Sequence, residues 1–157
     1  VQYFLQLLKP SNKWRILCND FTDLSGDSLI HCARTKEIAK IILDFASADS
    51  TREKFHMFLC HAKGISEETV LHTASRKGRL DVLHYILSNY AIAHTKLIYI
   101  EDTHKNSPLH LAKKSDIVQC LLSFIPAEKI DNFIWKPNND QQTVVHNAAQ
   151  TGRTDVV

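Results

Sequence analysis

The stretch Thr69-Val-Leu-His-Thr-Ala-Ser-Arg-Lys-Gly-Arg-Leu-Asp-Val-Leu-His-Tyr-Ile-Leu87 predicts two short helices joined by a tight turn. Thr69 is a good N-cap for the first helix, because its hydroxyl can accept a hydrogen bond from a free backbone N–H group. Gly78 stands where the chain must reverse, a position that favours a residue able to adopt a positive φ. Leucine and isoleucine then recur at helical spacing and give the second helix one apolar face. One pair of short helices cannot bury such a face, so the unit needs copies of itself on either side.

The sequence supplies these copies. Four histidines, His31, His72, His110 and His146, lie 41, 38 and 36 residues apart. An alanine follows each of them two residues later, an apolar residue directly precedes it, and a serine or threonine stands three residues before it. Turn-forming residues stand eight residues before the histidines, at Asp23, Gly64, Asp102 and Asn138. The four matches share one register, so the chain contains an internal repeat of four units.

This pattern resembles the ankyrin repeat, whose signature is T-P-L-H-x-A on a period of about 33 residues. Ser107-Pro-Leu-His-Leu-Ala112 comes closest to the full motif, and the other copies carry Leu29, Val70 and Val144 in place of the proline. The resemblance covers essentially the whole chain, residues 1–157, and implies one all-α domain, an ankyrin-type helical repeat solenoid of about four repeats. The repeat motifs begin near residues 28, 69, 107 and 143, and both chain ends fall inside a repeat, as in an excerpt from a longer protein.

The repeats depart from the family pattern in two ways. Repeats one and three are shortened, because only four residues separate Ala33 from Ile38 and Ala112 from Ile117, whereas repeats two and four keep a longer turn with a glycine. The extra length follows the second helix of each repeat, where a lysine precedes apolar residues at helical spacing. We therefore expect an extra short helix per repeat, marked by Lys13, Lys54, Lys96 and Lys129.

The repeat alignment also predicts individual elements. Added helices are expected near residues 11–18 and 52–60, and first helices near 29–35, 70–77 and 108–113, with another beginning at Val144. Second helices are expected near 37–46, 80–89 and 116–124. Residues 98–100 fit a short strand by composition, but their place in the repeat favours a helical turn.

Composition limits the class of protein. The chain is 44% hydrophobic and 23% charged, which is typical of a globular protein, and no apolar stretch reaches the length of a membrane span. The formal net charge of +2 does not by itself imply a nucleic-acid partner. The four cysteines form no C-x-x-C pair, so we expect buried free thiols in a reducing compartment, the cytoplasm: Cys18, Cys32, Cys60 and Cys120.

The histidines do not predict a metal or catalytic site. Stacked helices lie about 8–10 Å apart, too far for neighbouring repeat histidines to share a zinc ion at about 2.0–2.1 Å from each nitrogen. In the ankyrin family this histidine belongs to a structural hydrogen-bond network. His56, Cys60 and His61 can share one helix face, but no second ligand pair at zinc-finger spacing accompanies them. The chain also lacks a glycine-rich phosphate loop and an H-E-x-x-H motif, so we expect no enzyme, no metal and no cofactor.

A basic stripe is the remaining functional signal. Cations gather at or just after the end of each first helix, at Arg34, Lys36, Arg76, Lys77, Arg79, Lys113, Lys114 and Arg153. The helix macrodipole alone favours such cations by about 0.3–1 kcal/mol each. In ankyrin proteins, however, equivalent positions border the concave binding surface. We therefore expect Arg34, Arg76, Lys77, Lys113 and Lys114 to bind a partner protein with an acidic surface, and the loop tips around Ile65, Ser66, Thr103 and His104 to be the second choice.

The resemblance implies a scaffold for protein–protein recognition that binds through its concave face and loop tips. The rival hypothesis is that this segment recruits a partner for a larger effector enzyme, whose catalytic domain lies outside it. Long-loop ankyrin arrays occur in secreted effectors of intracellular bacteria, which implies delivery into a host cell. Nucleic-acid binding is the least favoured hypothesis, because the stripe lacks the interleaved aromatic residues that single strands stack on.

Overall fold

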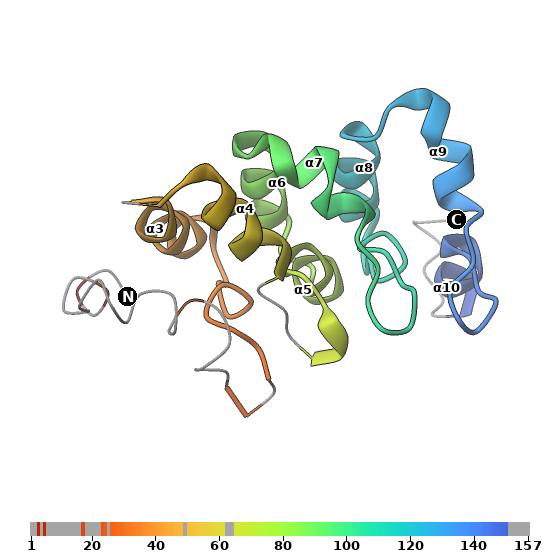
Figure 1. Cartoon of the computed structure of the whole chain (residues 1–157). Helices are drawn as coiled ribbons and strands as arrows, with labels where there is room; N and C mark the ends of the chain where they lie inside the picture. The colour runs from red at the N-terminus through yellow and green to blue at the C-terminus, as the bar shows by residue number, and fades with distance from the viewer. Residues whose placement is uncertain are drawn as a thin grey trace.

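The computed structural model describes residues 3, 5, 17, 23–24, 26–48, 50–61 and 65–150 of the chain. Among these residues it contains eight α-helices with defined bounds, two single-turn 3₁₀ helices and no strand (Figure 1), which confirms the predicted all-α class. The second helices of the repeats are α3 (Lys36–Ser47), α6 (Leu80–Asn89) and α8 (Ser115–Ser123), and the first helices are α5 (Val70–Lys77) and α10 (Val144–Gln150). The added elements are α4 (Arg52–His61), α7 (Ala91–Thr95) and α9 (Ala127–Ile134), with 3₁₀ turns at η2 (Ile65–Glu67) and η3 (Leu97–Tyr99).

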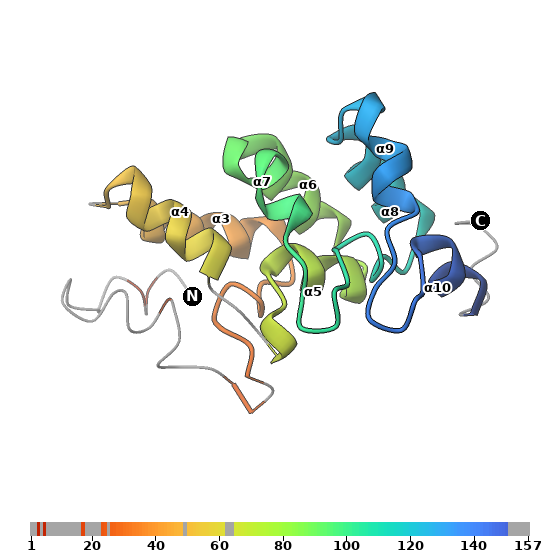
Figure 2. The same cartoon turned by 45° about the vertical axis from the view of Figure 1, so that its right-hand side comes forward.

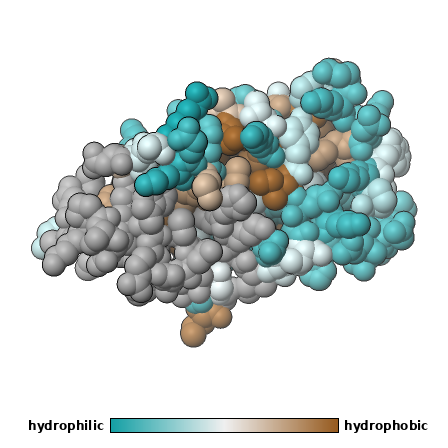
Figure 3. All heavy atoms as spheres, viewed as in Figure 1, coloured by the Kyte–Doolittle hydropathy of each residue, from teal (hydrophilic) through white to brown (hydrophobic). Residues whose placement is uncertain are grey.

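The helices form a row. Helix α6 contacts α3 on one side and α8 on the other, while α4 packs against α3 and α7 against α6 (Figure 2). The loops that precede the repeat motifs project from the opposite edge to the added helices (Figures 1 and 2). On the face seen in Figure 3, the C-terminal part is mostly polar and apolar side chains show mainly in the middle. Each repeat thus contributes one slice of a continuous stack.

The turn between α5 and α6 has the predicted geometry. Gly78 has a φ of 66°, its N–H donates to the carbonyl of Ser75 at 3.2 Å, and the N–H of Arg79 donates to the carbonyl of Ala74 at 2.8 Å. This pair of bonds is the Schellman motif, which ends a helix by satisfying its last carbonyl groups. Both helices occupy the ranges that the sequence predicted.

The core lies between successive second helices. Leu83 of α6 and Leu121 of α8 are both fully buried, as the helical spacing predicts. Ala39 and Ile42 occupy the matching positions of α3 and are also inaccessible to solvent. Burial of an aliphatic side chain contributes about 1.5–3 kcal/mol, so these residues contribute to the apolar stabilisation of the stack.

The first helices predicted at 29–35 and 108–113 are wrong. Both segments form consecutive turns, in which the N–H of His31 donates to the carbonyl of Ser28 at 2.9 Å and the N–H of His110 donates to that of Ser107 at 3.0 Å. The second helices α3 and α8 begin so soon after the motif that a first helix cannot form. Their N-cap residues, Thr35 and Lys114, have extended backbone only four residues after the histidine. In repeat two the N-cap residue of α6, Arg79, comes seven residues after the histidine, which leaves enough chain for the two turns of α5.

The added helices are confirmed where the structure describes them. Helices α4 and α9 lie where the lysine pattern predicted them, and the third copy divides into α7 and η3. Ile98 and Tyr99 belong to this helical turn, and Ile100 follows it with extended backbone but outside any strand. Of the first added helix, predicted at 11–18, only Leu17 lies within the described residues, and it is helical and buried.

The turn-forming residues before each motif build the same loop repeatedly. The side-chain Oδ1 of Asp23, Asp102 and Asn138 accepts the backbone N–H four residues later, at 3.0, 2.8 and 2.9 Å respectively. The fourth residue of each loop has a positive φ. This residue is Gly26, Lys105 or Gln141 in the three loops. Glu67 occupies the same place in the loop before the second motif and also has a positive φ. A short Asx side chain can make this local bond, which explains why the turn formers precede each histidine by eight residues.

Glycine at these loop positions is expected to raise stability. A left-handed conformation costs an L-residue roughly 1–2 kcal/mol, and the greater freedom of glycine in the unfolded chain offsets about half of that gain. Lys105→Gly and Gln141→Gly should each raise the free energy of unfolding by up to about 1 kcal/mol in urea titrations. The matched change in the opposite direction, Gly26→Ala, should lower it. A loss of stability in both glycine variants would contradict this account of the loops.

Replacing Ser75 by alanine is expected to raise the stability of the fold. Its hydroxyl lies fully buried in α5 and has no hydrogen-bond partner among the described residues. Ser75→Ala removes an unsatisfied polar group and installs a better helix former, so thermal denaturation should show a gain of about 0.5–1.5 kcal/mol. The control is Ser107→Ala, which deletes a buried hydroxyl that contacts His110 and should destabilise by about 1 kcal/mol. Equal losses in the two variants would mean that Ser75 has a partner.

Candidate functional site

The repeat histidines share one arrangement of hydrogen bonds. Nδ1 of each ring lies 2.8–2.9 Å from the serine or threonine hydroxyl three residues earlier, in all four repeats. In three of them, Nδ1 also accepts the backbone N–H of that same residue, for example from Thr69 to His72 at 3.1 Å. A backbone N–H can only donate, so Nδ1 carries no proton, and the proton of the neutral ring is on Nε2.

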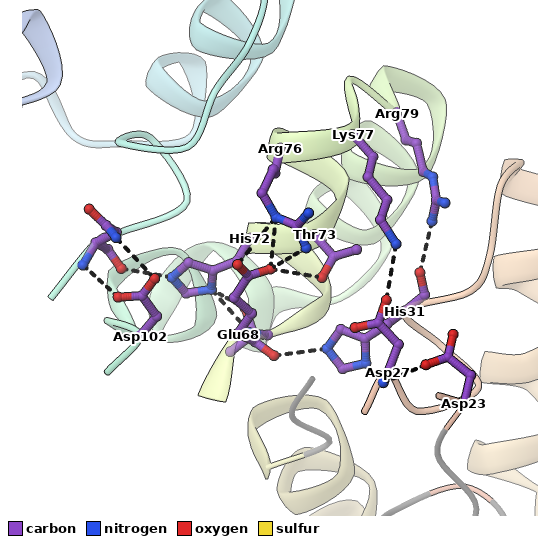
Figure 4. A network of polar contacts seen from close by, with 12 residues as sticks. Asp23, Asp27, His31, Glu68, His72, Thr73, Arg76, Lys77, Arg79 and Asp102 are labelled. Carbon is purple, nitrogen blue, oxygen red and sulfur yellow. Dashed lines mark hydrogen bonds and ion pairs between the residues drawn. The ribbon is translucent and has the colours of Figure 1, made fainter. Parts of the chain in front are cut away.

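The Nε2 protons link successive repeats. His31 Nε2 donates to the carbonyl of Glu68 at 2.9 Å, and His72 Nε2 donates to the carbonyl of Asn106 at 2.9 Å. His110 Nε2 donates to the carbonyl of Lys136 at 3.0 Å. Each ring therefore ties its own motif to the loop that leads into the next motif, as Figure 4 shows for His31 and His72. These histidines are structural bridges, as the resemblance implied, and they are not arranged around a common ligand.

Burial keeps the bridging rings neutral. Loss of hydration lowers the pKa of His31, His72 and His110, and the hydrogen bonds to backbone carbonyls oppose this shift only in part. Protonation would also place a second ring N–H against the backbone N–H of Thr69 or Ser107, two donors face to face. The stack thus depends on neutral imidazole.

Stability is expected to fall in mild acid. An unfolded histidine has a pKa of about 6.5 and the folded values lie lower, so below about pH 6.5 the unfolded chain binds more protons than the folded one. The free energy of unfolding should therefore be at its full value above this pH and decrease as the pH falls toward the folded pKa values. Urea titrations at pH 7.5 and 5.5 measure the loss.

Two variants separate the bridges from other titrating groups. His110→Gln should reduce the difference in unfolding free energy between the two pH values, whereas His104→Gln, at an exposed loop tip, should leave it unchanged. Equal stability of the wild-type chain at pH 7.5 and 5.5 would rule out buried neutral bridges.

Three cations of the predicted stripe make contacts inside the molecule. Arg76 pairs with Glu68, with Nη2 and Oε2 2.9 Å apart, and Lys77 pairs with the buried carboxylate of Asp27 at 3.0 Å (Figure 4). Arg79 Nη1 donates to the carbonyls of His31 and Ala33 at 2.8 and 2.7 Å. Arg79 thereby satisfies two carbonyl groups of the turns that stand in place of a first helix in repeat one. The contacts of Lys77 and Arg79 join repeats one and two, so these two side chains stabilise the stack.

The other cations of the stripe have no such role. Arg34, Lys113 and Lys114 are exposed, and none of them forms an ion pair with another described residue. The macrodipole does not account for them either, because they follow turns and not α-helices. They immediately precede α3 and α8, and a cation is unfavourable at a helix N-terminus. No ion pair within the described part of the chain therefore accounts for their charge.

The predicted loop tips lie side by side. The carbonyl of Ser66 accepts the N–H of Thr103 at 2.9 Å, and the carbonyl of His104 accepts the N–H of Asn139 at 2.9 Å. The side chains of Thr103 and His104 are exposed, and Ser66 is half-buried. The side chain of Ile65 lies outside the described residues. Because the backbone groups of these tips bond one another, only exposed side chains are free to contact a partner there.

The structure adds a surface that the sequence analysis missed. The first helix of repeat two offers little area, because residues 70–75 of α5 are all buried. A hollow of about 690 Å³ lies instead over the outward face of α6, and its lining includes Lys36, Leu80, His84, Tyr85, Ser88 and Lys114. The available signal was the spacing of Asp81, His84 and Ser88, which marks the face of α6 opposite its apolar positions.

The described part of the chain provides no metal site. No three histidine, cysteine or carboxylate side chains within it gather closely enough to hold an ion. Of the candidate ligands that the sequence analysis considered, His56, Cys60 and His61, the last has a side chain outside the described residues. Burial raises the pKa of the Cys60 thiol and disfavours the thiolate that zinc would need.

The cysteines that the structure describes are free thiols, but not all are buried. Cys60 and Cys120 are half-buried, and Cys32 is exposed, so the expectation of burial is wrong for Cys32. Cys32 lies in the turn that replaces the predicted first helix of repeat one. Its thiol lies 3.7 Å from the carboxylate of Asp23, and partial burial together with that charge raises its pKa. Cys18 lies outside the described residues.

Neither the helices nor known proteins identify a function for the chain. Within the described ranges, every helix is too short or too polar to cross a bilayer. The sequence matches no known protein-family model and no curated protein. The function therefore has to be argued from the geometry of the chain itself.

Proposed function

We propose that the chain is an ankyrin-type helical repeat solenoid with an extra short helix per repeat, and that it recognises a partner protein without catalysing a reaction. The four motif copies, the recurring histidine bridges and the loop with a positive φ five residues before each histidine support the repeat assignment. In such a quasi-one-dimensional stack, equivalent positions of successive repeats line up into an extended surface. A surface of this kind suits recognition of another protein.

The observation that carries the proposal is the set of unpaired cations, Arg34, Lys113 and Lys114. They are exposed, they stand beside helix N-termini that already carry partial positive charge, and they have no partner among the described side chains. Unpaired positive charge that costs stability is favoured when a binding partner supplies the opposite charge. The summed field of these residues would draw an acidic partner surface toward this edge and raise the association rate.

We leave the paired cations out of this proposed binding surface. Arg76 and Lys77, which the sequence grouped with the other three, neutralise Glu68 and Asp27 within the chain. Reversing the charge of Arg76 or Lys77 would lower stability as well as binding, so the two effects could not be separated.

The three free thiols of the described residues are compatible with a reducing compartment, where we place the chain.

Charge reversal at the free cations tests the proposal. The triple change Arg34→Glu, Lys113→Glu, Lys114→Glu should preserve the fold, because acidic side chains are favoured next to the N-termini of α3 and α8. It should weaken binding of a purified partner protein by about tenfold or more, mainly through the association rate, and the wild-type affinity should fall as salt rises. Surface plasmon resonance at two salt concentrations measures both effects.

The matched control is Lys54→Glu, Lys96→Glu, Lys105→Glu, which makes the same change of charge at exposed sites on α4, after α7 and at a loop tip. It should bind with nearly wild-type affinity, since these sites lie away from Arg34, Lys113 and Lys114. Undiminished binding by the folded triple variant would refute the proposal for this edge.

A further inference from the structure

Half of the Arg79 guanidinium group is free to bind an anion. Nη1 donates to the carbonyls of His31 and Ala33 at 2.8 and 2.7 Å, which fixes the group against the turns of repeat one (Figure 4). Both acceptors are neutral, and no described carboxylate forms an ion pair with Arg79. The Nε–H and Nη2–H donors have no hydrogen-bond partner among the described residues, and neither nitrogen is fully buried. These donors form the planar fork with which arginine binds a carboxylate or a phosphate.

A second arginine adjoins this fork. The guanidinium of Arg79 lies against the peptide bond that joins Ala33 to Arg34, and the side chain of Arg34 is exposed and has no ion pair among the described residues. Partial burial lowers the pKa of Arg79, and Arg34 is the neighbouring group whose charge changes that pKa most. Arg76 lowers it as well, and Asp27 opposes them with a smaller effect than that of Arg34. The field at the fork is therefore positive, and a bound anion would relieve the repulsion between the arginines.

The carboxylates at this junction of repeats one and two already have partners. Glu68 and Asp27 are held in ion pairs with cations of α5. Asp81 accepts the backbone N–H of Lys36 at 2.9 Å, and the charge of Lys36 offsets that of Glu37 beside it in the first turn of α3. The charges of the two neighbouring arginines are left without a counterion.

We propose that the fork of Arg79 and the side chain of Arg34 bind a phosphorylated side chain of a partner protein. The fork would donate to two phosphate oxygens and Arg34 to the third. A carboxylate has only two oxygens, which the fork alone satisfies, whereas a phosphate monoester carries about −1.5 to −2 charges at pH 7 and matches both arginines. The proposal rests on the recognition function above and names the chemical group that the partner presents. Because the site is open, contacts of the flanking peptide must add affinity, which favours a phosphorylated protein over free phosphate.

Peptide pools with a fixed central residue and random flanks provide the probe. The central residue is phosphoserine, serine or glutamate, and peptides retained by the purified chain are titrated singly by fluorescence anisotropy. The wild-type chain is compared with Arg34→Gln and Lys113→Gln, which each remove one exposed positive charge in a different repeat. A third variant, Arg79→Lys, keeps the charge and loses the fork. Inorganic phosphate is titrated in parallel, and thermal melts check that each variant folds.

We expect binders from the phosphoserine pool alone, with affinities at least about tenfold above that of inorganic phosphate, since the flanks add contacts. Arg34→Gln and Arg79→Lys should each weaken binding by about tenfold or more, because each loses charge-assisted hydrogen bonds. Lys113→Gln should change the affinity by less than about twofold, since solvent and salt screen its charge. The Nε–H resonance of Arg79 should shift as phosphopeptide is added. If Arg79→Lys does not fold, Arg34→Gln and this resonance decide.

Four results would overturn the phosphate site: equal retention of the serine or glutamate pool, wild-type binding by Arg34→Gln, equal weakening by Arg34→Gln and Lys113→Gln, or equal affinity for inorganic phosphate. The recognition function is tested separately. If the phosphoserine pool yields no binder while the reversal of Arg34, Lys113 and Lys114 still weakens binding of a purified partner, the phosphate site is wrong and the recognition function stands.

Discussion

The hydrogen bond from a neutral histidine to a backbone carbonyl of the next repeat is the interaction on which the structure depends. His31, His72 and His110 each donate to a carbonyl of the segment that leads into the following motif, and each ring is oriented by the hydroxyl three residues before it. The contact of His31 with the carbonyl of Glu68 is buried, and an unsatisfied carbonyl there would cost about 1–3 kcal/mol. The bridges fix the register between successive repeats, and the buried leucines and isoleucines of the second helices add apolar stabilisation.

The shortened repeats determine what the charged side chains do. Because repeat one ends its first segment in turns, two carbonyls are left for Arg79, and Lys77 from the end of α5 reaches Asp27. Because repeat three is shortened in the same way, Lys113 and Lys114 follow a turn and stand before α8 without such contacts. One sequence feature, the basic stripe, therefore divides into a structural part and a part that is free to meet a partner.

The sequence predicted the fold where the signal was local. Gly78, the apolar spacing of α6 and the motif period predicted α5, α6 and the helical class. The missing first helices were not recognised, because apolar spacing persists in segments 29–35 and 108–113 although the chain is too short there to complete two turns. The hollow over α6 could not be predicted, since it depends on how α3, α6 and α8 stack. The ion pairs of Arg76 and Lys77 likewise depend on carboxylates that only the fold brings close to them.

The tautomer and protonation state of His72 test the account most directly. A long-range ¹H–¹⁵N correlation spectrum of the imidazole, recorded from pH 7.5 to 5.0, reports which ring nitrogen carries the proton. The account predicts a proton on Nε2 alone at pH 7.5, because Nδ1 accepts from the N–H of Thr69 and Nε2 donates to the carbonyl of Asn106, with titration only below the pKa of about 6.5 of an unburied histidine. A proton on Nδ1, or a ring already charged near pH 7, would contradict it.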